Sequence, residues 1–335
     1  MFNLNFTKMK KSLFFAVATA MVLSSCSQNE IMQDASDANA IDFGIYTNQT
    51  TKGAEVNTSS LEGTGFKVEA RKSDDGAGYF GATNFTWSVD HYKTDAAKYW
   101  PTFDIDFLAY NDVLSAAPTG FSSAAGAFAE CSYNIPTAAE NQADIVFATL
   151  DDQNATGGTQ KTLTFKHALS RISVQAKCGA TGTGSTVKVK VTDITFKSLE
   201  TGDATLTMNP TAISWTQNGT DADVTTKLSS AAAAGFDNSD YVNLLADNSD
   251  LMIIPQAIAA TNTCDITYSI EDHGMVIKAS ATEQVDISAL STLVAGKQYT
   301  LRFTINGGIQ PITFTASVDA WGNGFSGTEG DITIN

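Results

Sequence analysis

The sequence predicts an all-β protein made of antiparallel β-sandwiches, and three features of the chain support this fold class. Apolar residues alternate with polar residues in short runs along most of the chain, which is the period of a half-buried strand. Clusters of Gly, Asn, Asp and Ser separate these runs, as turns between strands require. Long helical patterns are nearly absent, so the strand–helix–strand rhythm of a parallel doubly wound sheet is missing.

The predicted strands follow one another along nearly the whole chain. Their residues are mostly β-branched or aromatic, which suits the surface of a pleated sheet. Two short helices are predicted as well, at 228–234 and 285–293. In chain order, the predicted strands are 41–45, 66–70, 103–109, 145–147, 163–165, 172–176, 187–196, 206–208, 251–254, 266–270, 299–305 and 312–318.

The number of strands fits two sandwich domains in tandem better than one. A Gly- and Thr-rich stretch at 178–186 is the best boundary between them. We therefore expect an N-terminal β-sandwich over 40–178 and a C-terminal β-sandwich over 179–335.

The chain is acidic, and its composition is that of a globular protein. Its 335 residues include 36 Asp and Glu against 20 Lys and Arg, which gives a formal net charge of -16. Apolar residues make up 43% of the chain, too large a share for a disordered protein. Binding to nucleic acid needs a basic surface, so the acidic balance argues against a nucleic-acid partner.

The first residues are typical of an export signal. Three lysines precede an apolar run at 13–23, which is too short to span a bilayer and ends in Leu23-Ser24-Ser25-Cys26. This pattern predicts a lipoprotein signal peptide over 1–25 and a lipid on Cys26 that anchors the protein in a membrane. Residues 26–39 are polar and without periodicity, so they predict a flexible leader. An ordinary secretory signal that ends beside a chance cysteine is the alternative.

No residue spacing in the chain is typical of a catalytic or metal site. The histidines His91, His167 and His273 match no zinc or catalytic motif, and His167 is interpreted as a polar turn or sheet residue. Asp104 and Asp106 are predicted on the solvent face of a half-buried strand, where a glycosidase pair is the minor alternative. We therefore expect no enzyme activity, no catalytic residue, no metal and no cofactor.

Three further sets of residues have both a structural and a functional interpretation. An acidic run at 237–250 is interpreted as a solvated loop, with weak calcium binding as the alternative. Three cysteines are interpreted as buried small apolar residues, with one disulfide and one free thiol as the alternative: Cys131, Cys178 and Cys264. Four tryptophans lie in or beside apolar runs, which favours core packing over a sugar-binding platform: Trp87, Trp100, Trp215 and Trp321.

Several short stretches occur along the chain in an order that is more specific than any one of them. They are IDFG at 41–44, TTKGA at 50–54, LEGTGFKV at 61–68, WP at 100–101, IDFLAY at 105–110, DIVFA at 144–148, LTFKHALSRI at 163–172, VTDITFK at 191–197, IPQ at 254–256, AGKQY at 295–299 and VDAW at 318–321. In this order they resemble the fimbrillin family of Bacteroidales, the lipoprotein pilins of type V pili. The resemblance implies two transthyretin-like β-sandwich domains, export as a lipoprotein to the cell outer membrane, and assembly into a surface fimbria by strand exchange.

In pilins of this family a protease removes the first strand, and a strand of the next subunit fills the slot that is left. The resemblance assigns Ile41, Phe43 and Ile45 to the removable strand and places the cut near Lys52 and Gly53. The family often has Arg at the cut, so the Lys in this chain indicates a Lys-accepting or a different protease. Arg71 ends a predicted core strand and is a poorer site. A permanent strand at 41–45 is the alternative.

The C-terminal tail is the candidate donor strand, because Ile332 and Ile334 alternate there with Asp331 and Thr333. The tail is short and has few apolar residues. It therefore either pairs with 312–318 of its own chain or leaves the chain to enter a neighbour.

The sequence thus predicts a pilin-like structural subunit of a surface fimbria with a role in cell adhesion. Its expected partners are other pilin subunits in a head-to-tail polymer, the outer membrane through the lipid on Cys26, and a receptor on a host or bacterial surface. A carbohydrate-binding surface lipoprotein, also built of β-sandwiches, is the alternative function.

Overall fold

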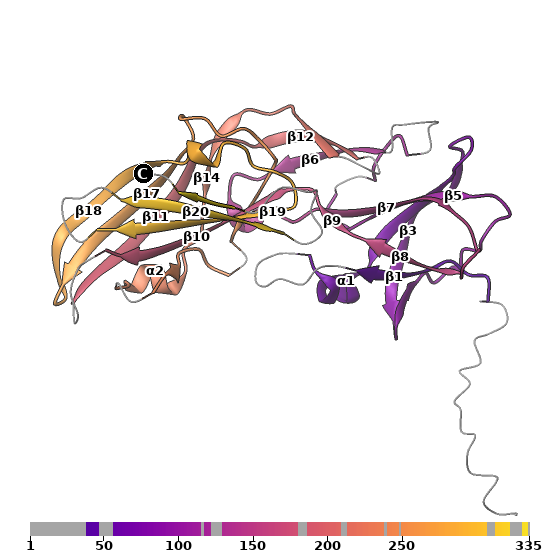
Figure 1. Cartoon of the computed structure of the whole chain (residues 1–335), viewed down its shortest axis with the longest axis horizontal. Helices are drawn as coiled ribbons and strands as arrows, with labels where there is room; N and C mark the ends of the chain where they lie inside the picture. The colour runs from indigo at the N-terminus through magenta and orange to yellow at the C-terminus, as the bar shows by residue number, and fades with distance from the viewer. Residues whose placement is uncertain are drawn as a thin grey trace, which may run out of the picture. The chain divides into compact units, whose positions relative to one another are not determined.

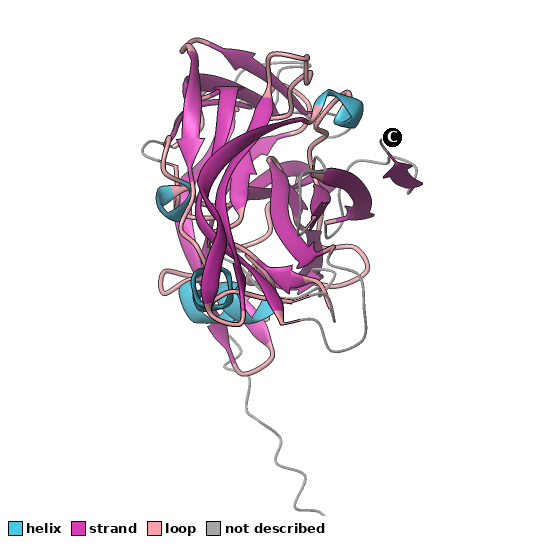
Figure 2. Cartoon of the chain, turned by 90° about the vertical axis from the view of Figure 1, so that its left-hand side faces the viewer, coloured by secondary structure: helices cyan, strands magenta, loops and turns pink. Residues whose placement is uncertain are grey.

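A computed structural model describes residues 38–46, 56–114, 117–121, 129–179, 186–208, 213–237, 240–247, 249–306, 312–321 and 330–333. These residues form strands and only small helices, so the predicted all-β class is confirmed (Figures 1 and 2). Within them, no helix has both the length and the apolar character needed to cross a membrane. Cys26 and the predicted signal peptide lie outside the described residues.

The largest sheet has eight strands and gathers the first part of the chain. Its members are β1 (Asp42–Tyr46), β2 (Phe66–Lys72), β3 (Gly78–Ser88), β4 (His91–Lys93), β5 (Ile105–Tyr110), β7 (Val146–Gln153), β8 (Gln160–Thr164) and β9 (Lys166–His167). They lie side by side in the order β8-β1-β4-β3-β2-β5-β7-β9. Most neighbours are antiparallel, but β1 runs parallel to β8.

Three further sheets contain the remaining strands. These are β6 (Ala129–Ile135), β10 (Ser170–Cys178), β11 (Val187–Glu200), β12 (Gly202–Met208), β13 (Ile213–Gln217), β14 (Asp221–Thr225), β15 (Val242–Asn243), β16 (Leu251–Ile253), β17 (Thr263–Asp272), β18 (Met275–Asp286), β19 (Lys297–Ile305), β20 (Thr313–Ala320) and β21 (Gly330–Thr333). One of these three sheets has the order β15-β10-β19-β20-β21, and β16 also pairs with β10. The other two have the orders β14-β11-β17-β18 and β13-β12-β6.

The helices are short and begin at local capping signals. In α1 (Thr58–Thr64), the Asn57 side chain accepts a hydrogen bond from Ser60 N, and Ser60 Oγ accepts one from Asn57 N. The helix α2 (Ser230–Ala234) confirms the helix predicted at 228–234. The helix predicted at 285–293 is wrong at its start, because Val285 continues β18; one 3-10 turn, Ser288–Leu290, follows, and another lies at Ala139–Asn141.

The buried apolar side chains form two clusters. One cluster runs from Ile41 to Phe165 in sequence and belongs to the eight-stranded sheet. The other runs from Leu108 to Trp321. Strands β6 and β10 pair with β12 and β19, so strands on both sides of the predicted boundary at 178/179 share sheets. The division into an N-terminal sandwich over 40–178 and a C-terminal sandwich over 179–335 therefore stays a prediction.

Strand β5 differs from its prediction as a half-buried strand, because all six of its residues are buried. Asp106 is only 6% exposed, so its predicted place on a solvent face is wrong. Arg71 Nε lies 3.1 Å from its Oδ2, and Ser73 Oγ and Asp152 N donate hydrogen bonds to its Oδ1. A buried carboxylate is tolerated when it is paired and hydrogen-bonded in this way. Asp106 is thus committed to an internal ion pair, which argues against a glycosidase role with Asp104.

Candidate functional site

The predicted removable strand, β1, lies inside the eight-stranded sheet between β4 and β8. Figure 1 shows β1 beside β8. Its pairing with β4 is antiparallel, with Phe43 opposite Tyr92. Its pairing with β8 is parallel and covers all five residues, from Asp42 opposite Gln160 to Tyr46 opposite Thr164. In the described strand order β8 lies at the edge, and β1 is its neighbour. Removing β1 would therefore expose one side of β4 and leave β8 without that neighbour.

The side chains of β1 alternate between core and partial exposure, as the sequence predicted. Ile41 and Phe43 are 1% and 0% exposed, whereas Asp42 and Gly44 are half-buried. The backbone of Ile45 continues the pairing with Leu163, and its side chain lies outside the described part of the structure. Ile41 N also donates a hydrogen bond to Lys98 O at 2.7 Å. The strand is thus an integral part of the core in the intact chain.

Phe43 lies at the centre of an aromatic cluster. Its ring meets those of Phe85, Phe107 and Phe66 edge to face, with centroid distances of 5.1, 5.2 and 6.4 Å. Aromatic pairs in this geometry stabilise a core beyond the area they bury. A slot left by β1 would therefore be lined by aromatic rings, and its most favourable occupant would place a large apolar side chain at the position of Phe43.

The predicted cut lies between β1 and α1, in a segment outside the described residues. Lys52 and Gly53 lie outside the described residues, which end at Tyr46 and begin again at Val56. Val56 N donates a hydrogen bond of 2.9 Å to Asp144 Oδ2, and α1 follows directly. A cut at Lys52 would separate β1 from the rest of the chain, while the segment from Val56 onward keeps its own contacts.

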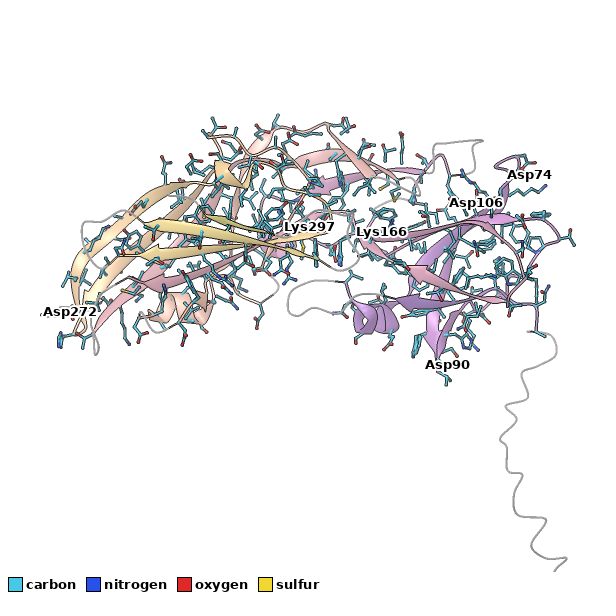
Figure 3. All side chains as sticks on the ribbon, viewed as in Figure 1. Asp74, Asp90, Asp106, Lys166, Asp272 and Lys297 are labelled. Carbon is cyan, nitrogen blue, oxygen red and sulfur yellow. The ribbon has the colours of Figure 1, made fainter. Side chains whose placement is uncertain are left out.

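Asp144 also belongs to a buried cluster with His167 and Trp321. His167 Nδ1 lies 2.8 Å from Asp144 Oδ2, and the His167 ring stacks on Trp321 with centroids 4.0 Å apart and an angle of 15°. All three side chains are at most 6% exposed. Figure 3 labels Lys166, the residue before His167 on β9. His167, interpreted from the sequence as a polar turn or sheet residue, lies on a strand and is buried.

This cluster joins the segment after the predicted cut to the segment before the candidate donor strand. Val56 bonds to Asp144 on one side, and on the other Trp321 directly precedes residues 322–329, which lie outside the described part. Sequence reasoning missed the cluster, although its members lie in the stretches DIVFA, LTFKHALSRI and VDAW. The shared family stretches were the one available signal.

The candidate donor strand is partly described. Strand β21 pairs antiparallel with β20, with Ile332 opposite Ala316, so the tail pairs with its own chain in this structure. The side chain of Ile332 and the whole of Ile334 lie outside the described part. Strand β21 stands at the end of the sheet order, with β20 as its neighbour. Release of β21 would therefore break only its hydrogen-bond ladder with β20.

The cysteines are free thiols buried in the core, which confirms their interpretation as small apolar residues: Cys131, Cys178 and Cys264. Burial raises the pKa of Cys131 to about 12 and that of Cys264 further still. The thiols of Cys131 and Cys264 are therefore protonated and unreactive at neutral pH. Among the described residues, no group of three or more His, Cys, Asp or Glu side chains could hold a metal ion.

The tryptophans have mainly packing roles in the structure. Trp100 and Trp321 are 5% and 0% exposed, which confirms the core interpretation for both. Trp215 packs against the larger core, and its Nε1 donates a hydrogen bond to Ala168 O at 2.8 Å. Trp87 is 36% exposed and meets the ring of Tyr92 edge to face. Only one of the four thus presents a large part of its ring to solvent.

Comparisons with known proteins agree on one family. Residues 38–321 match the family model described as fimbrillin-like. A stretch of 114 residues is 31% identical to the fimbrium subunit Fim1C of Phocaeicola vulgatus. That stretch covers 30% of this chain and 30% of the length of that curated relative.

Two solved structures share the fold. A fimbrial protein from Bacteroides vulgatus superposes with a TM-score of 0.67 at 18% identity, over 84% of this chain and 99% of that one. A candidate cell adhesion protein from Bacteroides uniformis superposes with a TM-score of 0.53 at 16% identity, over 84% of this chain and 98% of that one.

Proposed function

The chain belongs to the fimbrillin-like family, and from this premise we propose that it is a structural subunit of a surface fimbria assembled by strand exchange. The observation that carries the proposal is the position of β1. This strand is the first of the described fold, it lies between two other strands, and it fills the centre of an aromatic core. A protease that removes it would create an apolar slot together with unpaired backbone groups.

The free energy available from such a slot is large enough to drive assembly. Burying a side chain as large as Ile41 or Phe43 contributes about 1.5–3 kcal/mol, so these two alone contribute roughly 3–6 kcal/mol. The backbone of β4 and β8 would add ladder hydrogen bonds to any strand that enters. A contact in which each subunit inserts into the next is head to tail, and it builds an open fibre when the rotation between subunits does not close a ring.

The candidate donor is the C-terminal tail with Ile332 and Ile334. Its support is the edge position of β21, since an edge strand can leave without breaking a sheet in two. The tail then adds to a neighbouring subunit instead of to β20. Because the donor comes from one end of the chain and the slot from the other, the polymer is head to tail.

The order of the segments at the N-terminus means that the proteolytic cut would also release the protein from the membrane. The lipid on Cys26, the leader and β1 all precede Lys52, so one cut near Lys52 removes the anchor and the strand together. The lipoprotein is thus held at the outer membrane until the cut makes it competent to polymerise. Adhesion to a host or bacterial receptor would be a property of the assembled fimbria.

The positions of the arginines support a protease that accepts lysine. The sequence contains three arginines, and Arg71 and Arg171 are 6% and 1% exposed. Arg302 has an exposed side chain, but its backbone lies in β19 with β10 on one side and β20 on the other. Proteases cut exposed loops rather than paired strands, so the folded chain offers no arginine that suits an Arg-specific enzyme.

Limited proteolysis should therefore separate the two specificities. We expect an Arg-specific protease to leave the folded monomer intact, and a Lys-specific protease to give a product that begins at Gly53. Mass spectrometry of the products checks both results. The Lys52→Ala variant is the control and should lose the Gly53 product. Cleavage of the folded wild type by the Arg-specific enzyme would contradict the assignment.

The alternative, a lipoprotein that binds carbohydrate through a tryptophan platform, has less support. Such a platform needs several exposed rings, and two of the four tryptophans are buried in the cores. A glycan array that compares the wild type with Trp87→Ala tests whether the exposed Trp87 ring binds sugar. Loss of glycan binding in that variant would favour the alternative.

A further inference from the structure

A polar cavity of about 180 Å³ lies on the sheet that contains β10 and β19, and none of its lining residues belongs to β1 or to β21, the candidate donor strand. It is lined by Arg171, Ser173, Val174, Gln175, Asn243, Leu245, Ala246, Asp247, Asp250, Gln298 and Thr300. Figure 1 shows the two strands, and Figure 3 labels Lys297, the residue before Gln298 on β19. The proposed polymerisation gives this cavity no role.

The register of the two parallel strands explains why polar side chains gather here. Arg171 lies opposite Gln298, and Ser173 lies opposite Thr300. Residues two apart on a strand point to the same face, so these four share a face of the sheet with Gln175. The segment that carries Asn243 and Asp250 forms the rest of the wall. Between Arg171 and Ser173 on β10, the side chain of Ile172 enters the core.

Hydrogen bonds among the lining residues hold much of the wall in place. Ser173 Oγ donates to Thr300 Oγ1 at 3.1 Å, and Gln175 Nε2 donates to Asn243 Oδ1 at 3.0 Å. Arg171 donates from Nε and Nη2 to Asp250 Oδ2 at 2.9 and 2.7 Å. A preformed wall lowers the ordering cost of binding a ligand.

Other groups of the lining keep unused hydrogen-bonding capacity. Within the described part of the chain, the side chains of Gln298 and Asp247 make no hydrogen bond with another residue. Thr300 is 6% exposed and accepts from Ser173, and no acceptor for its own hydroxyl proton occurs in the same described part. The cavity therefore presents amide donors and acceptors, a hydroxyl donor and a carboxylate acceptor close together.

Charge and size narrow the class of ligand. One positive group, Arg171, faces two carboxylates, Asp247 and Asp250, so the lining has a net charge of 1 − 2 = −1 and disfavours an anion. The volume of about 180 Å³ has room for one small ring. Leu245 and Ala246 supply an apolar wall beside the polar one.

We propose that this cavity binds one neutral pyranose residue of a glycan. Each sugar hydroxyl both donates and accepts, which matches the mixed donors and acceptors of Gln298, Thr300 and Asp247. The C–H face of the ring would pack on Leu245 and Ala246. The subunit would then carry a weak sugar site of its own, repeated along every copy in a fibre, so that many sites act together.

The test uses the folded, uncut monomer and free glucose, galactose, mannose, fucose and N-acetylglucosamine as probes. Saturation-transfer NMR and amide shifts are expected to show binding of at least one sugar with a Kd of about 1–10 mM, at the amides of Ser173, Gln298 and Thr300. Gln298→Ala and Thr300→Val should each weaken binding about tenfold or more. Gln298→Ala should melt as the wild type does, because the Gln298 side chain makes no hydrogen bond with another residue of the described part of the chain. Thr300→Val loses the acceptor of the Ser173 Oγ hydrogen bond, so its amide spectrum without sugar is recorded as well and should show the fold of the wild type.

The matched control is Gln217→Ala, which removes a glutamine from β13 outside the cavity and should leave binding unchanged. Three results would overturn the proposal: no sugar shifts the amides of the cavity at about 50 mM, calcium alone shifts them, or the Gln298 and Thr300 variants bind as the wild type does. The assay uses monomers, so a failure here leaves strand exchange untouched, and a failure of polymerisation leaves this site testable.

Discussion

Replacing Phe43 with alanine is expected to lower the free energy of unfolding of the uncut monomer by about 3–5 kcal/mol. The reason is the place of this ring, which is fully buried and meets Phe66, Phe85 and Phe107 edge to face. Alanine would leave a cavity that the rigid aromatic neighbours cannot close. Urea denaturation of the monomer measures the effect.

The same substitution should have no effect on fibres, because the strand that carries Phe43 is absent from their subunits. Phe196→Ala is the matched control, since Phe196 is also fully buried but belongs to the other core. It should destabilise monomers and fibres alike. If Phe43→Ala weakens fibres as much as it weakens the monomer, β1 is a permanent strand and the proposal fails.

Ending the chain after Trp321 is expected to abolish fibre formation and leave a folded monomer. Trp321 has to stay, because it is fully buried and stacks on His167. The residues beyond it include β21, which pairs only along β20 in the described sheet. Without the tail no strand is available to enter the slot of the next subunit.

Electron microscopy of the protein after Lys-specific cleavage measures this effect, with the cleaved full-length chain as the control. A circular dichroism melt shows whether the truncated monomer is folded. Fibres of normal length and number from the truncated chain would identify a different donor.

Most strands with one buried face could be predicted from the sequence, and strands without such a face could not. Strand β6 is an exception, because its residues alternate strictly between buried and exposed and it was still missed. Strand β1 is recognised from Ile41 and Phe43, which alternate with Asp42 and Gly44. Strand β3 was missed because most of its residues are exposed or half-buried, so its sequence shows no alternation. Strand β18 was missed for the same reason, and its first residues, Met275 to Ile277, are 56–70% exposed.

Charged residues were the second cause of error. Asp106 was predicted on the solvent face because a carboxylate without a partner avoids the core. Its burial depends on Arg71, which lies 35 positions away in sequence and next to it in the sheet. No local pattern contains that pairing, so the full burial of β5 could not be predicted.

The candidate site was predicted in part. The alternation of β1 indicated which residues enter the core, but its neighbours are set by long-range pairing with Tyr92 and with Gln160 to Thr164. The cluster of Asp144, His167 and Trp321 was beyond prediction for the same reason, since its members are far apart in the chain. Periodicity identifies the inward face of a strand and says nothing about which strand lies beside it.

The central claim is that β1 is removed before subunits join, and intact-mass analysis of fibres taken from cells tests it most directly. We expect a subunit mass that begins at Gly53, without the lipid of Cys26 and without Ile41 or Phe43. A fibre subunit whose mass still includes Ile41 to Tyr46 would contradict the account.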